Sequence, residues 1–525
     1  MKVLITDSLS EAGVEILKAA GHEVLDRKGL AGPELLETIA DCQALIVRSG
    51  TKVTADVLEA AAKLMVVGRA GVGVDNVDVE AASRRGVIVM NTPEGNTIST
   101  AELTMAMVLA LSRNIPQAQA SLVAGEWNRK AFRGTELNGK TLGIIGLGRI
   151  GRAVARRAAA FGMKLVGYDP FVVDGPGGPL DIEMASLDDV IERADYITVH
   201  TPLNDETRGM LGAAEFERMK DGVRVINCAR GGIIDEAALR DALQSGKVAG
   251  CALDVYSSEP PKDCALIGMG PVVSTPHLGA LTAEAQQNVA EQVARQVCEV
   301  LDGRPARNAV NMPMIEPDAL AAVLPYAELA EKLGKAVVQL WDKPIREVRV
   351  SYRGEFTENP LDLVTASLLK GMLSMLMDGP INYVNAPIIA RERGVRVSEV
   401  TSAQSQDFAN IITAEVIDAE DSFLISGAFF GKKDPRIVRI NAYHVDVVPQ
   451  GHILVCENKD APGVISYVST ILSEHQTNIA NMTVGRDEPG GRAVTVINID
   501  GAVSADVMTA IKVSPIIFDV KLIQL

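Results

Sequence analysis

The sequence predicts an α/β protein with two doubly wound domains, one inserted in the other, followed by an α+β domain and a ferredoxin-like domain. Three observations carry this prediction. Short apolar strands alternate with helices twice before residue 310, a glycine-rich loop appears only after more than 140 residues, and residues 452–525 follow the order β-α-β-β-α-β. A chain of 525 residues is also too long for one hydrophobic core.

Residues 1–97 contain five short apolar stretches that we interpret as strands of a parallel sheet. Stretches with apolar residues at helical spacing separate them, which is typical of a doubly wound domain. The predicted strands are 2–7, 22–27, 44–49, 64–71 and 87–93, and the predicted helices are 10–21 and 54–63.

The same alternation begins again after residues 99–127, which we predict to form one long, largely buried helix. The second series contains the glycine-rich loop, so we predict a domain of residues 98–287 inserted between residues 1–97 and 288–310 of the first domain. The chain would then pass twice between the two doubly wound domains. Two domains connected in this way form a hinged cleft, which is the usual place for a cofactor site. The predicted strands are 141–148, 164–170, 195–202, 223–232, 250–256 and 272–279, and a long helix is predicted at 282–303.

Beyond residue 310 the pattern changes. Residues 317–450 predict an α+β domain with an alternating strand near 345–356, and we find no nucleotide or metal signature there. Residues 452–525 predict a self-contained ferredoxin-like unit at the end of the chain.

The segment TLGIIGLGRIGRAVA predicts a dinucleotide-binding, Rossmann-like loop. Gly146, Gly148 and Gly151 stand in G-x-G-x-x-G spacing between a strand and a helix, where glycines let the backbone approach a pyrophosphate at a helix N-terminus. Asp169 follows at the end of the next strand. Its carboxylate would accept hydrogen bonds from the ribose hydroxyls and repel a 2′-phosphate, so the sequence favours NAD over NADP.

Three further side chains follow strands of the same predicted sheet: Arg230, Glu259 and His277. The carboxyl ends of parallel strands are where open α/β sheets bind ligands, so we expect the three to meet near the cofactor. An arginine, a carboxylate and a histidine suit hydride transfer, because histidine has an ordinary pKa near neutral pH and acts as a general acid or base.

The composition is that of an ordinary globular protein, with 47% hydrophobic and 22% charged residues. A formal net charge of −16 argues against a nucleic-acid surface and requires a local basic pocket for any anionic substrate. The six cysteines are scattered, with no C-x-x-C pair and no histidine partners at the spacing of metal ligands. We therefore expect reduced thiols, no metal site and a cytoplasmic location. No apolar run suits a signal peptide or a membrane span.

Taken together, GRAGVGVDNVD, NTPEGNTISTAEL, ELNGKTLGIIGLGRIG, NCARGGIIDEAAL and TPHLGA give the chain a specific resemblance to the D-isomer-specific 2-hydroxyacid dehydrogenase family. The chain resembles the family's long form, whose tail carries an intervening domain, here residues 317–450, and an ACT regulatory domain, here residues 452–525. This resemblance implies NAD-dependent oxidation of 3-phospho-D-glycerate to 3-phosphooxypyruvate, the first step of serine biosynthesis.

The resemblance also implies roles for individual residues. Arg230, Glu259 and His277 become the catalytic trio, with His277 as the acid–base group. The implied cofactor contacts are Gly146, Gly148, Arg149, Ile150, Gly151, Asp169, Thr201, Cys228, Ala229, Arg230, Asp254, His277 and Gly279. The implied substrate contacts are Arg48, Arg69, Gly71, Val72 and Arg129, and Arg129, Lys130 and Arg133 are expected to approach from a neighbouring subunit.

In the ACT domain the resemblance implies a serine site between two subunits, formed by Asn458, Asp460 and Asn478. We therefore expect a homo-oligomer, a tetramer rather than a dimer, with L-serine as an effector. The glycine- and proline-rich segment 172–187 departs from the family pattern and is expected to alter the rim of the adenine pocket. Two alternative functions stay open, another D-2-hydroxyacid dehydrogenase acting on glycerate or hydroxypyruvate, and a non-enzymatic NAD-sensing scaffold.

Overall fold

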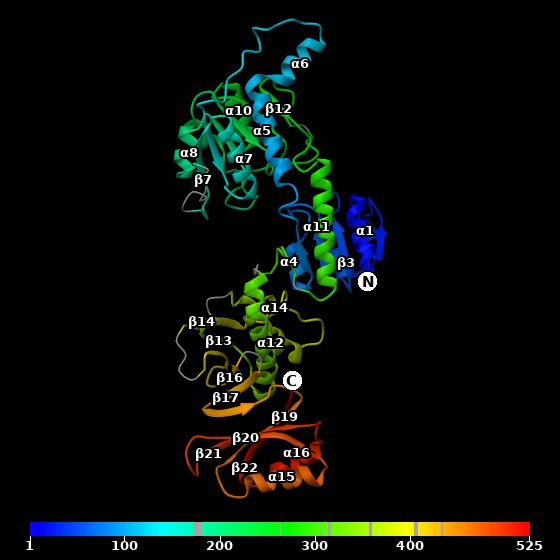
Figure 1. Ribbon diagram of the computed structural model, residues 1–525, viewed down its shortest axis with the longest axis vertical. Coiled ribbons are helices and arrows are strands. Elements are labelled where there is room, and N and C mark those ends of the chain that lie inside the picture. Colours follow the sequence, from blue (N-terminus) through cyan, green and yellow to red (C-terminus); the bar gives the residue numbers. More distant parts are fainter. Residues whose placement is uncertain are drawn as a thin grey trace.

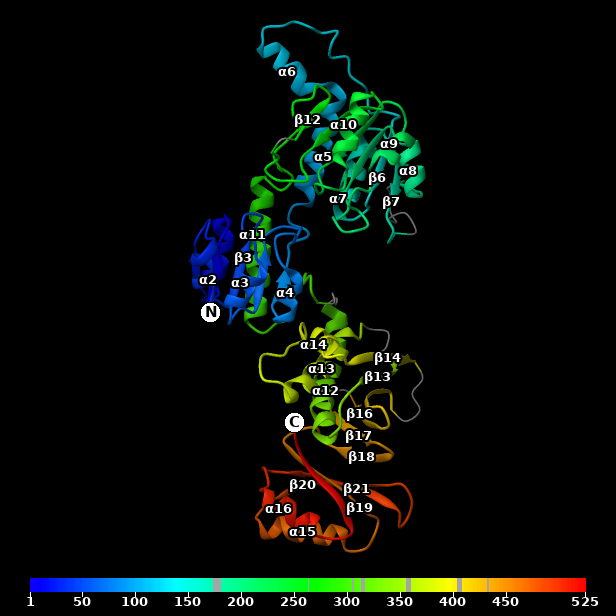
Figure 2. The ribbon, with the colours of Figure 1, turned by 180° about the vertical axis from the view of Figure 1, so that it is seen from behind.

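The protein extends along one long axis, with residues 97–274 at one end and residues 452–524 at the other (Figure 1). Residues 1–90 and 317–447 lie between these ends, in that order, and the view from behind shows the same arrangement (Figure 2). The computed structural model describes residues 1–172, 181–262, 264–304, 306–312, 317–355, 360–403, 408–431 and 434–525.

The first sheet is parallel throughout, with the strand order β2-β1-β3-β4-β5. Its strands are β1 (Lys2–Ile5), β2 (Glu23–Asp26), β3 (Ala44–Val47), β4 (Val66–Arg69) and β5 (Ile88–Met90). Its helices are α1 (Glu11–Ala19), α2 (Gly32–Ile39), α3 (Ala55–Ala60), α4 (Val79–Arg84) and, from much later in the chain, α11 (Ala283–Leu301). Val289, Val293 and Val297 of α11 share a buried core with Val3 and Ile5 of β1, so α11 belongs structurally to the first sheet.

The second sheet is also parallel, with the order β12-β11-β10-β9-β6-β7-β8. Its strands are β6 (Thr141–Ile145), β7 (Lys164–Tyr168), β8 (Glu183–Met184), β9 (Tyr196–Val199), β10 (Val223–Asn227), β11 (Val248–Leu253) and β12 (Val272–Ser274). Its helices are α5 (Thr97–Arg113), α6 (Ile115–Val123), α7 (Arg149–Ala160), α8 (Leu187–Arg193), α9 (Ala213–Arg218) and α10 (Glu236–Gln244). Strand order reverses beside β6, which places a topological switch point at its carboxyl end.

The prediction of one buried helix over residues 99–127 is wrong. Helix α5 ends at Arg113, Asn114 adopts a left-handed conformation with φ of 52°, and α6 begins at Ile115. Pro116 explains the break, because inside a continuous helix it could not donate to the turn before it. Only α5 is buried, since no residue of α6 is buried, and Val123 has 76% of its surface exposed.

The third sheet has the order β14-β13-β15-β16-β17-β18 and is antiparallel except for β13 beside β14. Its strands are β13 (Glu347–Gly354), β14 (Arg396–Ser402), β15 (Asn410–Ile417), β16 (Ser422–Phe430), β17 (Asp434–Ile440) and β18 (Tyr443–Val447), with helices α12 (Pro317–Leu340), α13 (Asp362–Leu376) and α14 (Ala386–Glu392). This part contacts the first domain, where Arg84 of α4 pairs with Glu392 of α14 at 2.9 Å.

The last unit is an antiparallel sheet with the order β20-β21-β19-β22, and its β-α-β-β-α-β order confirms the prediction. Its elements are β19 (His452–Lys459), α15 (Val464–Glu474), β20 (Ile479–Arg486), β21 (Arg492–Ile499), α16 (Ala505–Lys512) and β22 (Ile517–Gln524). Val455 and Ile523 share one buried core with Val337 and Val350, so the last two sheets pack against each other.

These four sheets confirm the predicted fold class, while the limits given for each domain stay predictions. Within the described ranges no helix is long and apolar enough to cross a membrane. No group of three or more potential metal ligands lies together in the described part of the chain. The six cysteines are all free thiols.

Candidate active site

A cleft with a volume of about 750 Å³ lies between the first and second sheets. Loops at the carboxyl ends of strands from both sheets line it, as expected for open α/β sheets. It contains fifteen of the predicted site residues: Arg48, Arg69, Gly71, Val72, Gly148, Arg149, Ile150, Thr201, Cys228, Ala229, Arg230, Asp254, Glu259, His277 and Gly279. Gly146, Gly151, Asp169 and Arg129 lie outside its lining.

The glycine loop between β6 and α7 has the geometry that a bound dinucleotide requires. Gly146 has a φ of 95°, and a Cβ there would lie 2.8 Å from the His200 backbone. A Cβ on Gly151 would lie 2.0 Å from the Gly146 carbonyl oxygen, so only glycine allows the helix to approach the strand. Gly148 faces open space at the start of α7, where a pyrophosphate can reach the helix N-terminus.

Asp169 lies beside this loop, just after β7. Its Oδ2 accepts a hydrogen bond from the Leu147 N–H at 2.8 Å, and its Oδ1 accepts one from the Phe171 N–H at 2.9 Å. Each carboxylate oxygen has a further lone pair that can accept from a ribose hydroxyl. Thr201 adds a buried hydroxyl in the cleft that has no partner among the described residues. These residues therefore fit an NAD molecule.

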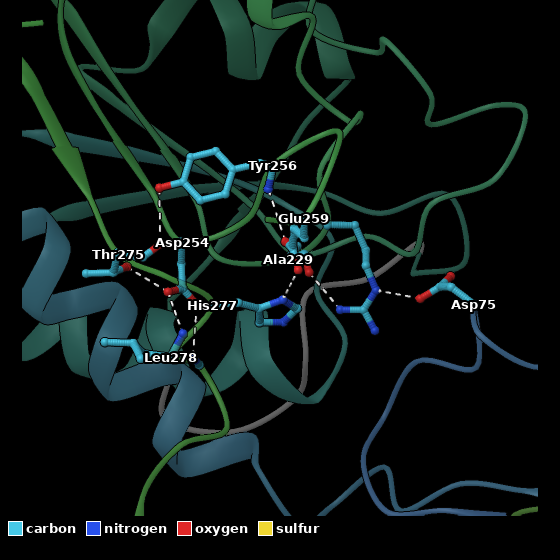
Figure 3. Close-up of polar contacts among 10 residues, drawn as sticks. Asp75, Ala229, Asp254, Tyr256, Glu259, Thr275, His277 and Leu278 are labelled. Atoms are coloured by element: carbon cyan, nitrogen blue, oxygen red, sulfur yellow. Dashed lines mark hydrogen bonds and ion pairs between the residues drawn. The ribbon is translucent and has the colours of Figure 1, made fainter. Parts of the chain in front are cut away.

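His277 points toward Glu259 in the cleft, and its Nδ1 lies 2.6 Å from the Glu259 Oε2 (Figure 3). The Tyr256 N–H donates to the other carboxylate oxygen at 3.2 Å. Burial raises the pKa of the Glu259 carboxyl, but the His277 ring, the Tyr256 N–H and the charge of Arg230 together hold that pKa below its ordinary value. Glu259 is therefore an ionised acceptor for the imidazole.

Asp254 holds the segment that carries His277. Its buried carboxylate accepts from the Thr275 hydroxyl at 2.6 Å, the Leu278 N–H at 2.7 Å and the Gly279 N–H at 2.9 Å (Figure 3). The His277 N–H donates to the Asp254 carbonyl oxygen at 2.9 Å. With its oxygens engaged in this way, Asp254 fixes the backbone around His277, which has a left-handed φ of 54°.

A second histidine, His200, also lines the cleft, but its environment differs. Burial lowers the pKa of His200 to about 4, and its Nε2 lies 3.0 Å from the Thr198 hydroxyl. His200 is therefore neutral at physiological pH. Of these two cleft histidines, His277 alone contacts a carboxylate within hydrogen-bonding distance in the described part of the chain.

Three guanidinium groups line the cleft, those of Arg48 and Arg69 from the first domain and that of Arg230 from the loop after β10. Burial together with the charges of Arg230 and Arg48 lowers the pKa of Arg69 to about 10. The buried Nε of Arg69 has no hydrogen-bond partner among the described residues. A buried donor beside like charges is suited to an anionic ligand, because charge-assisted hydrogen bonds would satisfy it.

Two acidic residues that the sequence analysis did not single out pair with arginines of the site. Asp75 accepts from the Nε of Arg230 at 3.0 Å, and Glu94 lies 3.6 Å from Arg149. Asp75 stands within GRAGVGVDNVD and Glu94 within NTPEGNTISTAEL, but only the folded chain brings each acid opposite its arginine.

Arg129, Lys130 and Arg133 are exposed in the loop after α6, so the cleft of the same chain does not use them. Arg129 was predicted as a substrate contact, and one chain alone does not provide that contact. Segment 172–187 was predicted to alter the adenine pocket, but its residues 173–180 lie outside the described residues.

The predicted serine-site residues do not meet within one chain. Asp460 follows the end of β19 that pairs with Arg492, whereas Asn478 precedes the end of β20 that pairs with Ile499. The antiparallel register thus places them at opposite ends of the sheet. Asn458 is buried, accepts from the Thr495 hydroxyl and donates to the Lys459 carbonyl oxygen, so its amide is already engaged.

Comparisons with known proteins agree with this architecture. Residues 105–279 match the family described as D-isomer specific 2-hydroxyacid dehydrogenase, NAD binding domain. Residues 322–441 match the D-3-phosphoglycerate dehydrogenase intervening domain, and residues 452–515 match the ACT domain.

Relatives of the same length identify the whole chain. It is 46% identical to D-3-phosphoglycerate dehydrogenase of Methanocaldococcus jannaschii over 100% of both chains. It is 43% identical to the Bacillus subtilis enzyme of the same name, over 100% of this chain and 99% of that one. A solved NAD-dependent formate dehydrogenase from Staphylococcus aureus, in complex with NAD, covers 59% of this chain and 98% of its own at 31% identity, with a TM-score of 0.53. The chain therefore belongs to the D-3-phosphoglycerate dehydrogenase family of NAD-dependent enzymes of serine biosynthesis, in the form that carries an intervening domain and an ACT domain.

Proposed function

We propose that His277 is the acid–base group with which this enzyme oxidises 3-phospho-D-glycerate to 3-phosphooxypyruvate. The observation that carries the proposal is the 2.6 Å contact between His277 Nδ1 and Glu259 Oε2. A carboxylate can only accept, so the neutral ring carries its proton on Nδ1 and offers the lone pair of Nε2. His277 then takes the proton of the C2 hydroxyl, and NAD supplies the acceptor for the hydride that leaves C2.

Glu259 and Arg230 support this step. Glu259 fixes the tautomer of His277 and stabilises the imidazolium that forms. Arg230 binds the substrate carboxylate and polarises the developing carbonyl group at C2, because a guanidinium presents two parallel donors. The Gly71 N–H donates to the Arg69 carbonyl oxygen, and the N–H groups that follow it at Val72 and Gly73, which line the cleft, hold the same carboxylate.

The phosphoryl end of the substrate meets Arg48 and Arg69. Support comes from the buried Nε of Arg69 and from the two other guanidinium groups in the same cleft. An enzyme for glycerate or hydroxypyruvate would use Arg230 for the carboxylate but would have no phosphoryl group for Arg48 and Arg69, and a scaffold that only sensed NAD would not need the Glu259–His277 pair.

Asp169 gives the cofactor site its preference for NAD. Its carboxylate is anchored by two backbone N–H groups and accepts from the ribose hydroxyls of NAD. A 2′-phosphate at the same position would bring a second anion against that carboxylate, so NADP is disfavoured.

The enzyme works as a homo-oligomer, a tetramer rather than a dimer. Support comes from α6 and the loop after it, where Leu122, Val123 and Trp127 are 55%, 76% and 80% exposed. Exposed apolar side chains in one segment favour burial against a second copy. The basic loop with Arg129 would then approach the cleft of that copy.

L-serine binds between two ACT domains, with Asp460 from one copy and Asn478 from another. Support comes from the register of the sheet, which keeps these residues at opposite ends within one chain and leaves both near its surface. Six free thiols are consistent with a reducing compartment, and we place the enzyme in the cytoplasm.

Steady-state rates with each of the two acids, 3-phospho-D-glycerate and D-glycerate, in combination with NAD or NADP test the proposal. Wild-type enzyme should show a higher kcat/KM with 3-phospho-D-glycerate than with D-glycerate, and with NAD than with NADP. Equal kcat/KM values for the phosphorylated and the unphosphorylated acid would favour the glycerate enzyme instead.

A further inference from the structure

Arg230 is held on two sides by contacts from different domains. Its Nη1 donates to the Ala229 carbonyl oxygen at 2.7 Å, within the loop after β10. Its Nε donates to Asp75 at 3.0 Å, and Asp75 belongs to the loop between β4 and α4 of the first domain (Figure 3). The orientation of a guanidinium needed for chemistry therefore depends on a residue across the cleft.

The loop that carries Asp75 also packs closely on the guanidinium. A Cβ on Gly73 would lie 1.8 Å from the Nη2 of Arg230 and 2.8 Å from Oδ2 of Asp75. The φ of Gly73 lies outside the left-handed region, so the relevant feature is the space that Gly73 leaves for these two side-chain ends. A side chain at residue 73 would therefore displace the Arg230 guanidinium or the Asp75 carboxylate from their present contact.

The segment around Asp75 is itself fixed. The Asn76 side chain donates to the carbonyl oxygens of Arg48 and Thr51, both at 2.6 Å. Asp78 caps α4 by accepting from the Ala81 N–H at 2.9 Å. Because its neighbours are anchored in this way, Asp75 presents its carboxylate from a rigid position.

Stability does not account for this ion pair. The side chains of Arg230 and Asp75 are 27% and 62% exposed, and exposed pairs contribute little to folding. An acid beside the site also repels an anionic substrate. What the contact offers is a fixed direction for the Arg230 guanidinium, in addition to the favourable charge that Asp75 presents to Arg69.

We propose that Asp75 is a positioning residue for Arg230, which orients the guanidinium toward the substrate carboxylate across the domain interface. The inference rests on the proposed role of Arg230 in binding that carboxylate. Because Asp75 and Arg230 come from opposite domains, the guanidinium is held by both Ala229 and Asp75 only when the two domains stand in the right relation. Asp75 thereby couples the closure of the cleft to substrate binding.

A double-mutant cycle on the full-length enzyme tests this inference. Asp75→Ala should lower kcat/KM for 3-phospho-D-glycerate about 10-fold to 100-fold, since small misplacements of a binding group have effects of that size. Asp75→Asn keeps an acceptor oxygen and should recover part of the loss. Arg230→Lys removes the Nε donor, so adding Asp75→Ala to it should cause little further loss.

A control variant, NADH binding and the unfolding temperature separate the positioning of Arg230 from a general loss of acidic charge, of cofactor binding or of stability. Asp56→Asn removes an exposed acid in α3 that lies outside the cleft lining and should leave kcat/KM unchanged. Asp75→Ala should bind NADH as wild type does and unfold at the same temperature. An Asn variant as impaired as the Ala variant, or an equal loss in the Arg230→Lys background, would overturn the inference. If Arg230→Lys kept full activity, the proposed role of Arg230 would fail instead.

Discussion

The Nδ1 of His277 lies 2.6 Å from the Oε2 of Glu259, although the two residues come from different loops of the second sheet. Asp254 fixes the backbone around the histidine, and the Tyr256 N–H holds the other oxygen of the glutamate. Both members of the pair are thus fixed before substrate arrives, which is the condition for efficient proton transfer.

Replacing Glu259 with Gln should lower kcat by about 10-fold to 100-fold while NADH binding persists, because the imidazolium loses its counter-charge. Steady-state rates and NADH fluorescence titration measure the two effects. A Gln variant with wild-type kcat would show that the carboxylate is not needed.

The same substitution should change how stability depends on pH. Folding lowers the pKa of Glu259, so the ionised carboxyl stabilises the protein above its unfolded value of about 4.3. This contribution is lost as the pH falls through the lower pKa of the folded state. The difference in Tm between wild type and Glu259→Gln should therefore shrink toward zero in acid. A difference in Tm that grew as the pH fell would contradict the prediction that ionised Glu259 stabilises the folded protein.

Asp169→Ala should weaken NAD binding and reduce discrimination against NADP, and the KM values for both cofactors measure this. Asp169→Asn is the matched variant, because its remaining carbonyl oxygen can still accept from a backbone N–H. We expect Asn to relax the discrimination with a smaller loss of NAD affinity. If wild-type enzyme already used NADP as well as NAD, Asp169 would not have the role given to it.

Arg69→Gln should raise the KM for 3-phospho-D-glycerate by about 10-fold to 100-fold, the range expected for a hydrogen bond to a charged group. Rates with D-glycerate should change little, because that substrate lacks the phosphoryl group. Inorganic phosphate should raise the Tm of wild type more than that of the variant, because burial and the neighbouring Arg230 and Arg48 lower the pKa of Arg69 to about 10 and a bound anion offsets both effects. Equal losses with both substrates would point to a general structural role.

Asp460→Ala in the full chain should abolish the response to millimolar serine and leave the basal rate unchanged, because every acid–base residue lies in the first two domains. Coupling between an effector and an active site is typically about 1–3 kcal/mol, so the rate should change about 5-fold to 150-fold in wild type. Arg486→Gln is a matched control, since it removes the side-chain ion pair of Asp460 but keeps the carboxylate and the hydrogen bond that it accepts from the Gly490 N–H. A wild-type enzyme whose rate and Tm ignore serine would refute the site.

The sequence predicted what depends on local pattern. Apolar stretches marked the strands, and the spacing of Gly146, Gly148 and Gly151 marked the cofactor loop. Arg230, Glu259 and His277 were expected to meet because parallel strands end at the same edge of a sheet. The split of the predicted helix at Asn114 was missed, although Pro116 was visible as a signal in the sequence.

What the sequence could not predict depends on contacts between distant segments. Asp75 and Arg230 are 155 positions apart, and no periodicity links them. The opposite placement of Asp460 and Asn478 follows from an antiparallel register that the sequence alone did not define. Such pairs become visible only when the domains are folded and placed together.

The central claim is that His277 exchanges the proton of the C2 hydroxyl, and the turnover of His277→Ala tests it most directly. NADH formation from 3-phospho-D-glycerate should fall about 10²- to 10⁴-fold, the usual worth of general acid–base catalysis. NADH binding in the same preparation should stay close to that of wild type, and His444→Ala, a change in β18 far along the chain, should leave turnover unchanged. A His277→Ala enzyme that turned over at a near-normal rate would contradict the account.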